Sequence, residues 1–314
     1  MQFPKISEYV KASQDASDNL GMSTKATIAE FNESIMDEFG VKYSKDGRKL
    51  LKAPQNLDGT YSIKEGVRII CNNAFWGCCS LTDIVIPDSV TSIGDKAFYR
   101  CSSLTSFVIP NGVTRIGTWT FLGCSSLKEV AIPDSVSSIG DGAFASCLSL
   151  SNIVIPDGVT SIGDGAFWNC PSFLIKYISI PKSVICLNGN PFVKWEGKLE
   201  CLSPSFVYED NILFNKDKSR IISFRNQELT SYVIPASVTS IGDRAFRHCS
   251  SLKSLVVPDS VTSIGDRAFA KCCSLTEVVI PDSVTSIGDR AFYGCSFPYN
   301  LKQELISRFG RKIF

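Results

Sequence analysis

The sequence lacks most of what enzymes, nucleic-acid-binding proteins and membrane proteins usually require. It has one histidine, His248, which excludes any mechanism that needs two. Lys and Arg number 32 against 31 Asp and Glu, a net charge of +1, without the basic excess of a nucleic-acid binder. No apolar run approaches the ~18 residues of a membrane span, and the first residues show no apolar core of a secretion signal. We therefore expect no nucleic-acid partner and no membrane insertion.

Common catalytic motifs are also missing. The sequence contains no G-x-S-x-G, no G-x-x-x-x-G-K-[ST] and no G-x-G-x-x-G. His248 directly precedes Cys249, but neighbours in sequence seldom face each other as a catalytic Cys–His pair must. We interpret His248 as an exposed turn residue. We predict no catalytic, cofactor-binding or metal-binding residues, and a protein that is not an enzyme.

What the sequence does contain is a repeat. Eight of its 13 cysteines recur every 23 residues in two runs, and prolines, valines and phenylalanines keep the same register. A fixed period between about 20 and 50 residues indicates stacked supersecondary units. The repeating cysteines are Cys78, Cys101, Cys124, Cys147, Cys170, Cys249, Cys272 and Cys295. The repeating phenylalanines are Phe75, Phe98, Phe121, Phe144, Phe167, Phe192, Phe246, Phe269 and Phe292.

Each position of the repeat suggests a structural role. A strand-like piece such as 81–87 begins the unit, and a glycine follows its second apolar pair, where we expect left-handed backbone. The next residue is usually Asp, which we expect to cap the short turn that carries Ala-Phe. We interpret the cysteines as buried free thiols that pack like small apolar side chains. Coils about 4.8 Å apart also lie within disulfide range, so bridges between coils stay open as an alternative, as does zinc.

The unit L-x-x-I-x-I-P-x-x-V-x-x-I-G-x-x-A-F-x-x-C resembles the BspA-type leucine-rich repeat over about residues 63–295. The resemblance implies an α/β repeat solenoid of right-handed leucine-rich-repeat coils with a parallel β-sheet, a 23-residue period and helical caps. That family contains surface proteins of bacteria and protist parasites, some implicated in adhesion to host matrix proteins. The absent signal peptide and the free cysteines favour a cytoplasmic location, whereas the resemblance favours the cell surface.

Departures from the period divide the chain. Residues 1–40 are predicted to form a helical segment, with a helix over 24–39 stopped by Gly40. Residues 41–62 read as a β-hairpin, 63–295 as about ten coils with a second hairpin near 207–230, and 296–314 as a capping helix. Asn300 is the expected N-cap of that helix, and Gly310 lies beyond its end. Capped ends favour a monomer.

Positions that vary from coil to coil are the candidates for binding. On each strand, the residue four before the proline is expected to point outward beside a stripe of valines. The predicted protein-binding face comprises Asp83, Ser106, Glu129, Asn152, Tyr177, Ser254 and Glu277, together with the turn residues Trp76, Tyr99, Trp168 and Tyr293. A Thr/Ser ladder that could bind ice or carbohydrate lattices is a further alternative.

From these observations we predict a non-enzymatic protein-binding module that presents an extended solenoid face to a protein partner. The alternative is a structural or adhesive cell-surface protein that binds host or matrix proteins.

Overall fold

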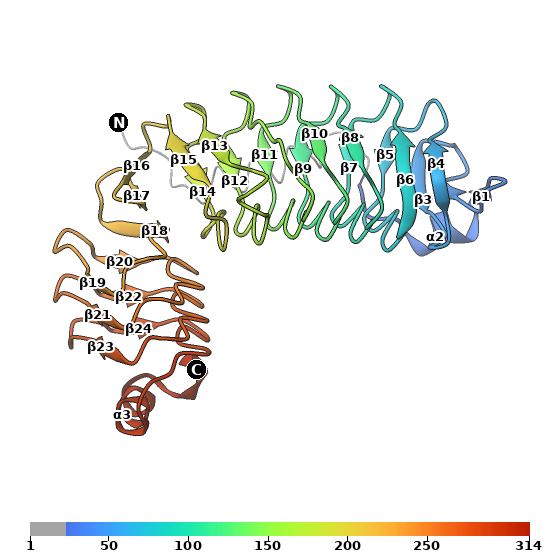
Figure 1. Ribbon diagram of the computed structural model, residues 1–314. Helices are drawn as coiled ribbons and strands as arrows, with labels where there is room; N and C mark the ends of the chain where they lie inside the picture. The colour runs from blue at the N-terminus through green and yellow to red at the C-terminus, as the bar shows by residue number, and fades with distance from the viewer. Residues whose placement is uncertain (1–22) are drawn as a thin grey trace, which may run out of the picture.

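The computed structural model describes residues 23–314 and shows a stack of about ten coils with one bend (Figure 1). We call residues 41–203 arm 1, residues 206–224 the elbow and residues 225–314 arm 2. The predicted parallel solenoid with its 23-residue period is confirmed, because strands in successive coils pair in parallel and residue 106 aligns with residue 129. Part of the predicted N-terminal segment, residues 1–22, lies outside the described residues.

Most coils contribute one longer strand to a surface that we call the strand face. Its strands are β4 (Asp58–Ser62), β6 (Ser80–Val85), β8 (Ser106–Val108), β10 (Glu129–Ala131), β13 (Tyr177–Ile180), β15 (Lys198–Cys201), β19 (Ser231–Val233), β21 (Ser254–Val256) and β23 (Glu277–Val279). Along β8, Phe107 is buried between the less buried Ser106 and Val108, as expected for a strand with one face on the core.

A second, shorter strand follows in most coils. These strands are β5 (Ile69–Ile70), β7 (Ser92–Ile93), β9 (Arg115–Ile116), β11 (Ser138–Ile139), β12 (Ser161–Ile162), β14 (Cys186–Leu187), β20 (Ser240–Ile241), β22 (Ser263–Ile264) and β24 (Ser286–Ile287). The segment that carries Ala-Phe follows as consecutive turns, which we call the Phe turn. The coil is therefore built of two strands and a turn, without a helix.

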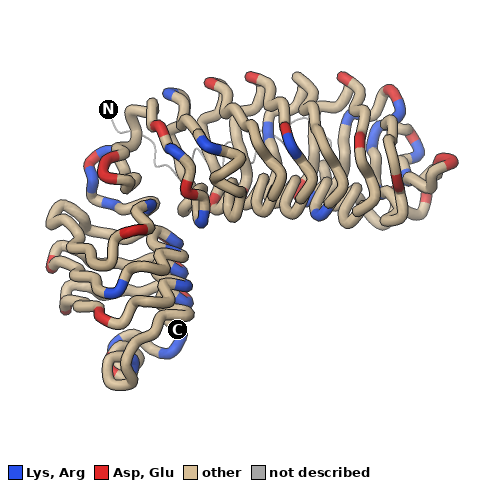
Figure 2. Tube along the Cα trace, in the orientation of Figure 1, with Lys and Arg blue, Asp and Glu red and all other residues tan. Residues whose placement is uncertain are grey.

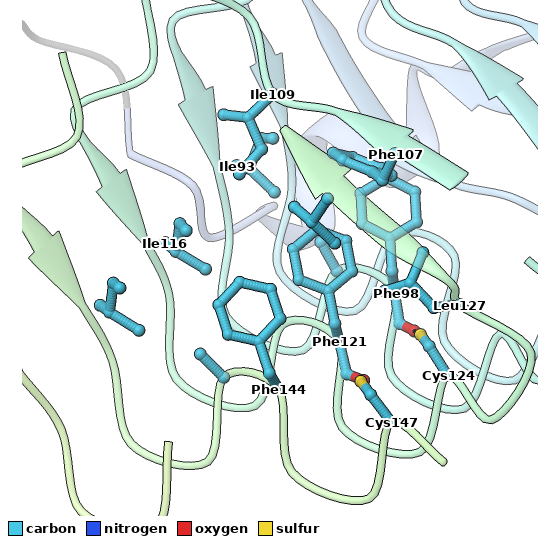
Figure 3. Packing of buried hydrophobic residues seen from close by; sticks show 14 of the residues in the cluster. Ile93, Phe98, Phe107, Ile109, Ile116, Phe121, Cys124, Leu127, Phe144 and Cys147 are labelled. Atoms are coloured by element: carbon cyan, nitrogen blue, oxygen red, sulfur yellow. Dashed lines mark hydrogen bonds between the residues drawn. The ribbon is translucent and has the colours of Figure 1, made fainter. Parts of the chain in front are cut away.

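The recurring phenylalanines form the centre of the core. From Phe75 to Phe192 neighbouring rings lie 5.0 to 6.0 Å apart and within 8° of parallel. The cysteines lie beside them as free thiols, and Cys147 Sγ donates to the carbonyl oxygen of Phe121 at 3.2 Å (Figure 3). Burial raises the pKa of Cys124 to about 12, so the thiol stays protonated. The cysteine column thus links each coil to the one before it.

The glycine after the second apolar pair has a different role from the one expected. Gly265 does not have positive φ; the left-handed residue comes two positions later, at Arg267 (φ 51°), and Gly142 (φ 57°) holds the same place in another coil. A Cβ on Gly265 would stand 2.2 Å from Asp243 Oδ1 and 2.6 Å from Asp243 N. The prediction of left-handed backbone is therefore wrong at the glycines of this column, where close approach between coils is the reason for glycine, although Asn211 at the same position of an irregular coil has a φ of 61°.

The aspartates that follow these glycines bridge coils. Asp243 Oδ1 accepts from the N–H of Asp266 at 2.8 Å, and Asp266 Oδ1 accepts from the N–H of Asp289 at 2.8 Å. The expected capping of each residue's own turn is wrong, because the acceptor serves the next coil. The column is structural, as predicted, and its carboxylates satisfy backbone donors between coils.

The N-terminal end is mostly strand. Helix α2 (Ile28–Asn32) ends early, and the chain enters β1 (Ile35–Met36), which pairs with β2 (Lys42–Tyr43) and through it with β3 (Lys49–Lys52). The predicted helix over 24–39 is wrong beyond Asn32. Asp37 Oδ1 accepts from the N–H groups of Phe39 and Val41, which fixes a turn where the helix was expected.

The C-terminal end carries a helix. Helix α3 (Tyr299–Phe309) and the short 3₁₀ helix η1 (Arg311–Ile313) place Leu305 and Ile313 in the core of arm 2. The N-cap is Pro298, so the predicted cap Asn300 lies inside the helix, and this expectation is wrong. Gly310 ends the helix with φ 81°.

The elbow is a set of antiparallel strands between the arms. Strands β16 (Phe206–Glu209), β17 (Ile212–Asn215) and β18 (Arg220–Phe224) pair in sequence, and β18 then pairs in parallel with β20 of arm 2. Ile212 and Phe214 pack in the core of arm 2, while Leu213 packs in that of arm 1. Because alternate residues point to opposite sides of a strand, β17 separates the two cores at the bend.

Candidate functional surfaces

The predicted strand residues lie on the strand face, but the elbow divides them. Glu129, Asn152, Tyr177 and Glu277 are exposed, whereas Asp83, Ser106 and Ser254 are partly buried. Those from Asp83 to Tyr177 belong to arm 1, and Ser254 and Glu277 belong to arm 2, in a separate sheet. The strand face therefore consists of two surfaces instead of one extended face.

A stripe of exposed valines follows these residues along the strand face. On arm 1, Val85 is 53% exposed, Val108 70% and Val154 68%. On arm 2, Val233, Val256 and Val279 continue the same column with 66%, 43% and 63% exposure. Exposed apolar side chains in a row, flanked by polar residues that change from coil to coil, are typical of a surface that binds another molecule.

A cavity of about 360 Å³ interrupts the strand face of arm 1. Strand pairing along this face narrows to the single bridge between Glu129 and Asn152, and β13 pairs with β15 beyond it. The cavity opens between these coils and is lined by residues 151–155 and by Leu174, Lys176, Tyr177 and Ser179. Two of the predicted face residues, Asn152 and Tyr177, thus lie at one concave site.

Hydrogen bonds orient the polar wall of this cavity. The Tyr177 hydroxyl and Ser179 Oγ both donate to the Glu200 carboxylate, the second at 3.0 Å. The bond to the carboxylate raises the pKa of Tyr177, and the bond from the phenol lowers the pKa of Glu200. Sequence reasoning missed Lys176, Ser179 and Glu200. The available signal was the 25-residue step from Pro156 to Pro181, which marks the coil where the pairing is interrupted.

The predicted turn aromatics lie on the Phe turns, away from the strands. Trp76 and Tyr99 stack with 6.3 Å between their ring centroids. On the Phe turns of other coils, cations lie over the aromatic rings. Arg247 lies over Trp168 at 5.2 Å and Lys271 over Tyr293 at 4.7 Å. The predicted strand residues and the predicted turn aromatics therefore lie on two different segments of the coil, the strand face and the Phe turn.

His248 is in a turn, as expected, but it is partly buried, so the prediction of an exposed residue is wrong. Its φ is 69°, and Nε2 is buried without a hydrogen-bond partner among residues 23–314. Burial, followed by the nearby cations Arg247, Lys194 and Lys271, lowers the pKa of His248 to about 4. The side chain is therefore neutral near pH 7.

The threonine ladder uses its hydroxyls within the stack. Thr262 Oγ1 donates to the carbonyl oxygen of Thr239, and Thr285 Oγ1 to that of Thr262, each at 3.3 Å. These hydrogens already satisfy backbone acceptors of the preceding coil. The ladder therefore strengthens the contact between coils.

Over residues 23–314, there is no group of three or more His, Cys, Asp or Glu side chains arranged to hold a metal ion. None of the helices in this range has the length and apolar character that crossing a membrane requires.

The repeat defines the class of protein. Residues 60–196 and 220–314 match the BspA type leucine-rich repeat region in six copies. The chain belongs to this family, and the resemblance inferred from the repeat unit is confirmed. The stretch between the two matched ranges contains the elbow strands β16 and β17, which explains why the match stops there.

Solved structures with similar folds are bacterial leucine-rich repeat proteins. One from Eubacterium ventriosum is 29% identical with a TM-score of 0.61, over 69% of this chain and 60% of that one. A leucine-rich cell surface protein from Faecalibacterium prausnitzii is 29% identical with a TM-score of 0.53, over 79% and 68%. The pneumococcal vaccine antigen PcpA, 24% identical with a TM-score of 0.61 over 83% and 73%, shows the fold alone. Among curated proteins, none matches the chain.

Proposed function

We propose that the protein is a non-enzymatic binding module and that the strand face of arm 1 receives a protein partner. The observation that carries this proposal is the row of exposed valines beside the cavity at Asn152 and Tyr177. Burial of such side chains by a partner is favourable at roughly 25 cal/mol per Å² of apolar surface.

The constant and variable positions of the repeat support this use of the surface. The recurring Phe and Cys side chains are buried and the Asp column bridges neighbouring coils, so these positions serve to hold coil to coil. Along arm 1 the residues beside the valines change from one coil to the next, from Ser106 to Glu129 to Asn152. A rigid frame with a changing outer row gives shape and charge specificity without a catalytic pocket.

The test is affinity capture from the source cells with a paired set of variants. In the face variant, Val108→Glu and Val154→Glu place charges on the stripe. The control is Ile185→Glu, a comparably exposed apolar residue (58%) outside the stripe. A specific partner is expected with wild type and control but lost from the face variant. Equal recovery with all three proteins would show that the partner does not use this surface.

Adhesion at a cell surface is the second candidate, favoured by the similarity to the F. prausnitzii cell surface protein over 79% of this chain. Cys79 and Cys273 are exposed free thiols, so they provide a direct assay. A membrane-impermeant maleimide applied to intact source cells should label the protein if it is displayed outside. Labelling only after lysis would exclude display and leave the intracellular binding module.

We also propose that the chain is monomeric, because α3 and η1 cover the last coil of arm 2 with Leu305 and Ile313. Light scattering at two concentrations tests this.

A further inference from the structure

A group of cations lines the inside of the bend. Figure 2 shows Lys and Arg along the side of arm 2 that faces into the bend. We define the elbow cluster as Trp168 and Lys194 of arm 1 with Arg247, His248, Arg267 and Lys271 of arm 2. All lie on Phe turns, where the two arms meet. For a chain with a net charge of +1, this is a local concentration of positive charge.

The arms are held together beside this cluster. Arg244 forms an ion pair with Asp164 of arm 1, and Asn190 Nδ2 donates to the carbonyl oxygen of Arg244 at 3.0 Å. Arg225 of arm 2 lies 4.5 Å from the ring centroid of Trp195 and donates through Nη2 to Gly197 O at 2.5 Å. These contacts hold the two arms together without using the cations of the cluster.

The four cations of the cluster have no counter-ions among the residues that the structure describes. Over residues 23–314, Lys194, Arg247, Arg267 and Lys271 form no ion pair. Arg267 is a close neighbour of Arg247, and burial together with this like charge lowers the pKa of Arg247. Such an arrangement is unfavourable unless an anion accompanies it.

Buried side-chain nitrogens without a hydrogen-bond partner are concentrated at the elbow cluster. Across the described part of the chain, the buried side-chain nitrogens that lack a partner belong to Trp168, Arg225, Arg247 and His248. Three of these residues are in the cluster, and Arg225 precedes Arg247 in the same column of the repeat. Buried side-chain nitrogens in proteins nearly always have a hydrogen-bond partner, and those of Trp168 and Arg247 can only donate, so they require an acceptor. Arg247 is also stacked on Trp168, which restricts its guanidinium before any ligand arrives.

We propose that the elbow cluster is a binding site for a multiply charged oxyanion of the phosphate class. A planar guanidinium matches the oxygens of such a group with paired hydrogen bonds, and lysines add point charge. A ligand with a single negative charge would leave most of the cations uncompensated. The site lies on the Phe turns, so it is distinct from the strand face that we propose for the protein partner.

The experiment is calorimetric titration of the full chain with pyrophosphate at constant ionic strength. Wild type is expected to bind, while Arg247→Gln and Arg267→Gln should each weaken binding by about tenfold or more, as expected for loss of one charged contact. Arg267→Gln keeps the stack on Trp168 intact, so it reports binding even if Arg247→Gln disturbs the elbow. The matched control is Arg100→Gln, which removes an arginine stacked at 5.3 Å on Tyr99 in arm 1 and should bind like wild type.

Two further arms identify the source of the anion. Phosphoserine that binds more tightly than pyrophosphate would assign the site to a phosphorylated molecule, and the reverse order to a free phosphate compound. The proposal is overturned if wild type shows no binding at about 10 mM pyrophosphate, where a millimolar site would be largely filled. It is also overturned if Arg100→Gln loses as much affinity as Arg267→Gln. The double Val→Glu face variant should keep anion binding, which separates this site from the proposed function.

Discussion

At the scale of single residues, the thiols show how a reactive group becomes a packing group. Cys101, Cys124 and Cys147 are completely buried, and each donates its S–H to the carbonyl oxygen of a phenylalanine in an earlier coil. Burial raises the pKa of Cys124 to about 12. A thiol in this state provides almost no thiolate, which is the reactive form.

We therefore expect native protein at pH 8 to react rapidly with Ellman's reagent at only two thiols, Cys79 and Cys273, which are the exposed ones. In denaturant all 13 should react. Replacement of both exposed cysteines by serine is the control and should remove the rapid phase. Fewer than 13 reactive thiols after unfolding without reductant would instead indicate disulfides.

Several residues of the Phe turns have left-handed backbone although they are not glycine, so their backbone conformation is strained. Arg290 is exposed and has a φ of 54°, which an L-residue with a Cβ adopts at a cost of about 1–2 kcal/mol. Arg290→Gly should therefore be more stable than Arg290→Ala by about 1 kcal/mol in urea unfolding. At Thr285, which has no such φ, the order should reverse and Ala should be the more stable. Equal stability of the two Arg290 variants would contradict the strain.

At the scale of elements, the contact between coils is the unit of structure. Each coil is fixed to its neighbour by short parallel strands, by the phenylalanine stack and by the Asp column. The coils contain no helix that would stabilise a single coil by itself. Contacts with neighbouring coils must therefore hold each coil in its folded conformation.

The Asp column gives a direct test. Asp266→Ala should lower the free energy of unfolding by about 1 kcal/mol, because the N–H of Asp289 loses its acceptor. Asp266→Asn keeps a side-chain oxygen in place and should lose much less. If Asn were as damaging as Ala, the charge of the carboxylate would matter more than its hydrogen bond.

Much of this element-scale structure could be predicted from the sequence, and the failures have physical causes. The period fixed the strands and the phenylalanine core, because identical units can bury their apolar side only by stacking. The reason for the glycine at 265 was missed, because the clash involves Asp243, 22 positions earlier in the chain. The helix expected over 24–39 ends early because its apolar residues, such as Ile28 and Ile35, stay exposed and no core contact stabilises it. Asp37 fixes a turn in its place.

The cavity at Asn152 was only partly predictable. The sequence marked its outward residues and the extended coil, but not the interruption of pairing beside β13, which depends on how three coils meet. The elbow cluster could not be found at all from sequence, because Trp168 and Arg247 approach only after the chain bends.

At the scale of the whole molecule, the bend depends on few contacts. The Arg244–Asp164 ion pair is partly buried and joins the arms directly. Arg244→Gln removes an interaction worth about 2 kcal/mol, between the values for exposed and fully buried pairs. We expect small-angle X-ray scattering to show a larger maximum dimension or a broader distance distribution for this variant.

The control for this measurement is Arg115→Gln. It breaks an exposed pair with Asp95, 3.5 Å between Nη2 and Oδ1, inside arm 1. Its scattering should match that of wild type. Identical curves for all three proteins would mean that the elbow strands alone set the bend.

An antiparallel strand pairs with the first short parallel strand of each arm. β3 provides the edge on which β5 is laid down, and β18 provides one for β20. The parallel strands of each arm therefore take their pairing register from the antiparallel strand at the start of that arm. A gene that gained or lost one 23-residue unit would lengthen or shorten one arm and leave the elbow and the other arm unchanged.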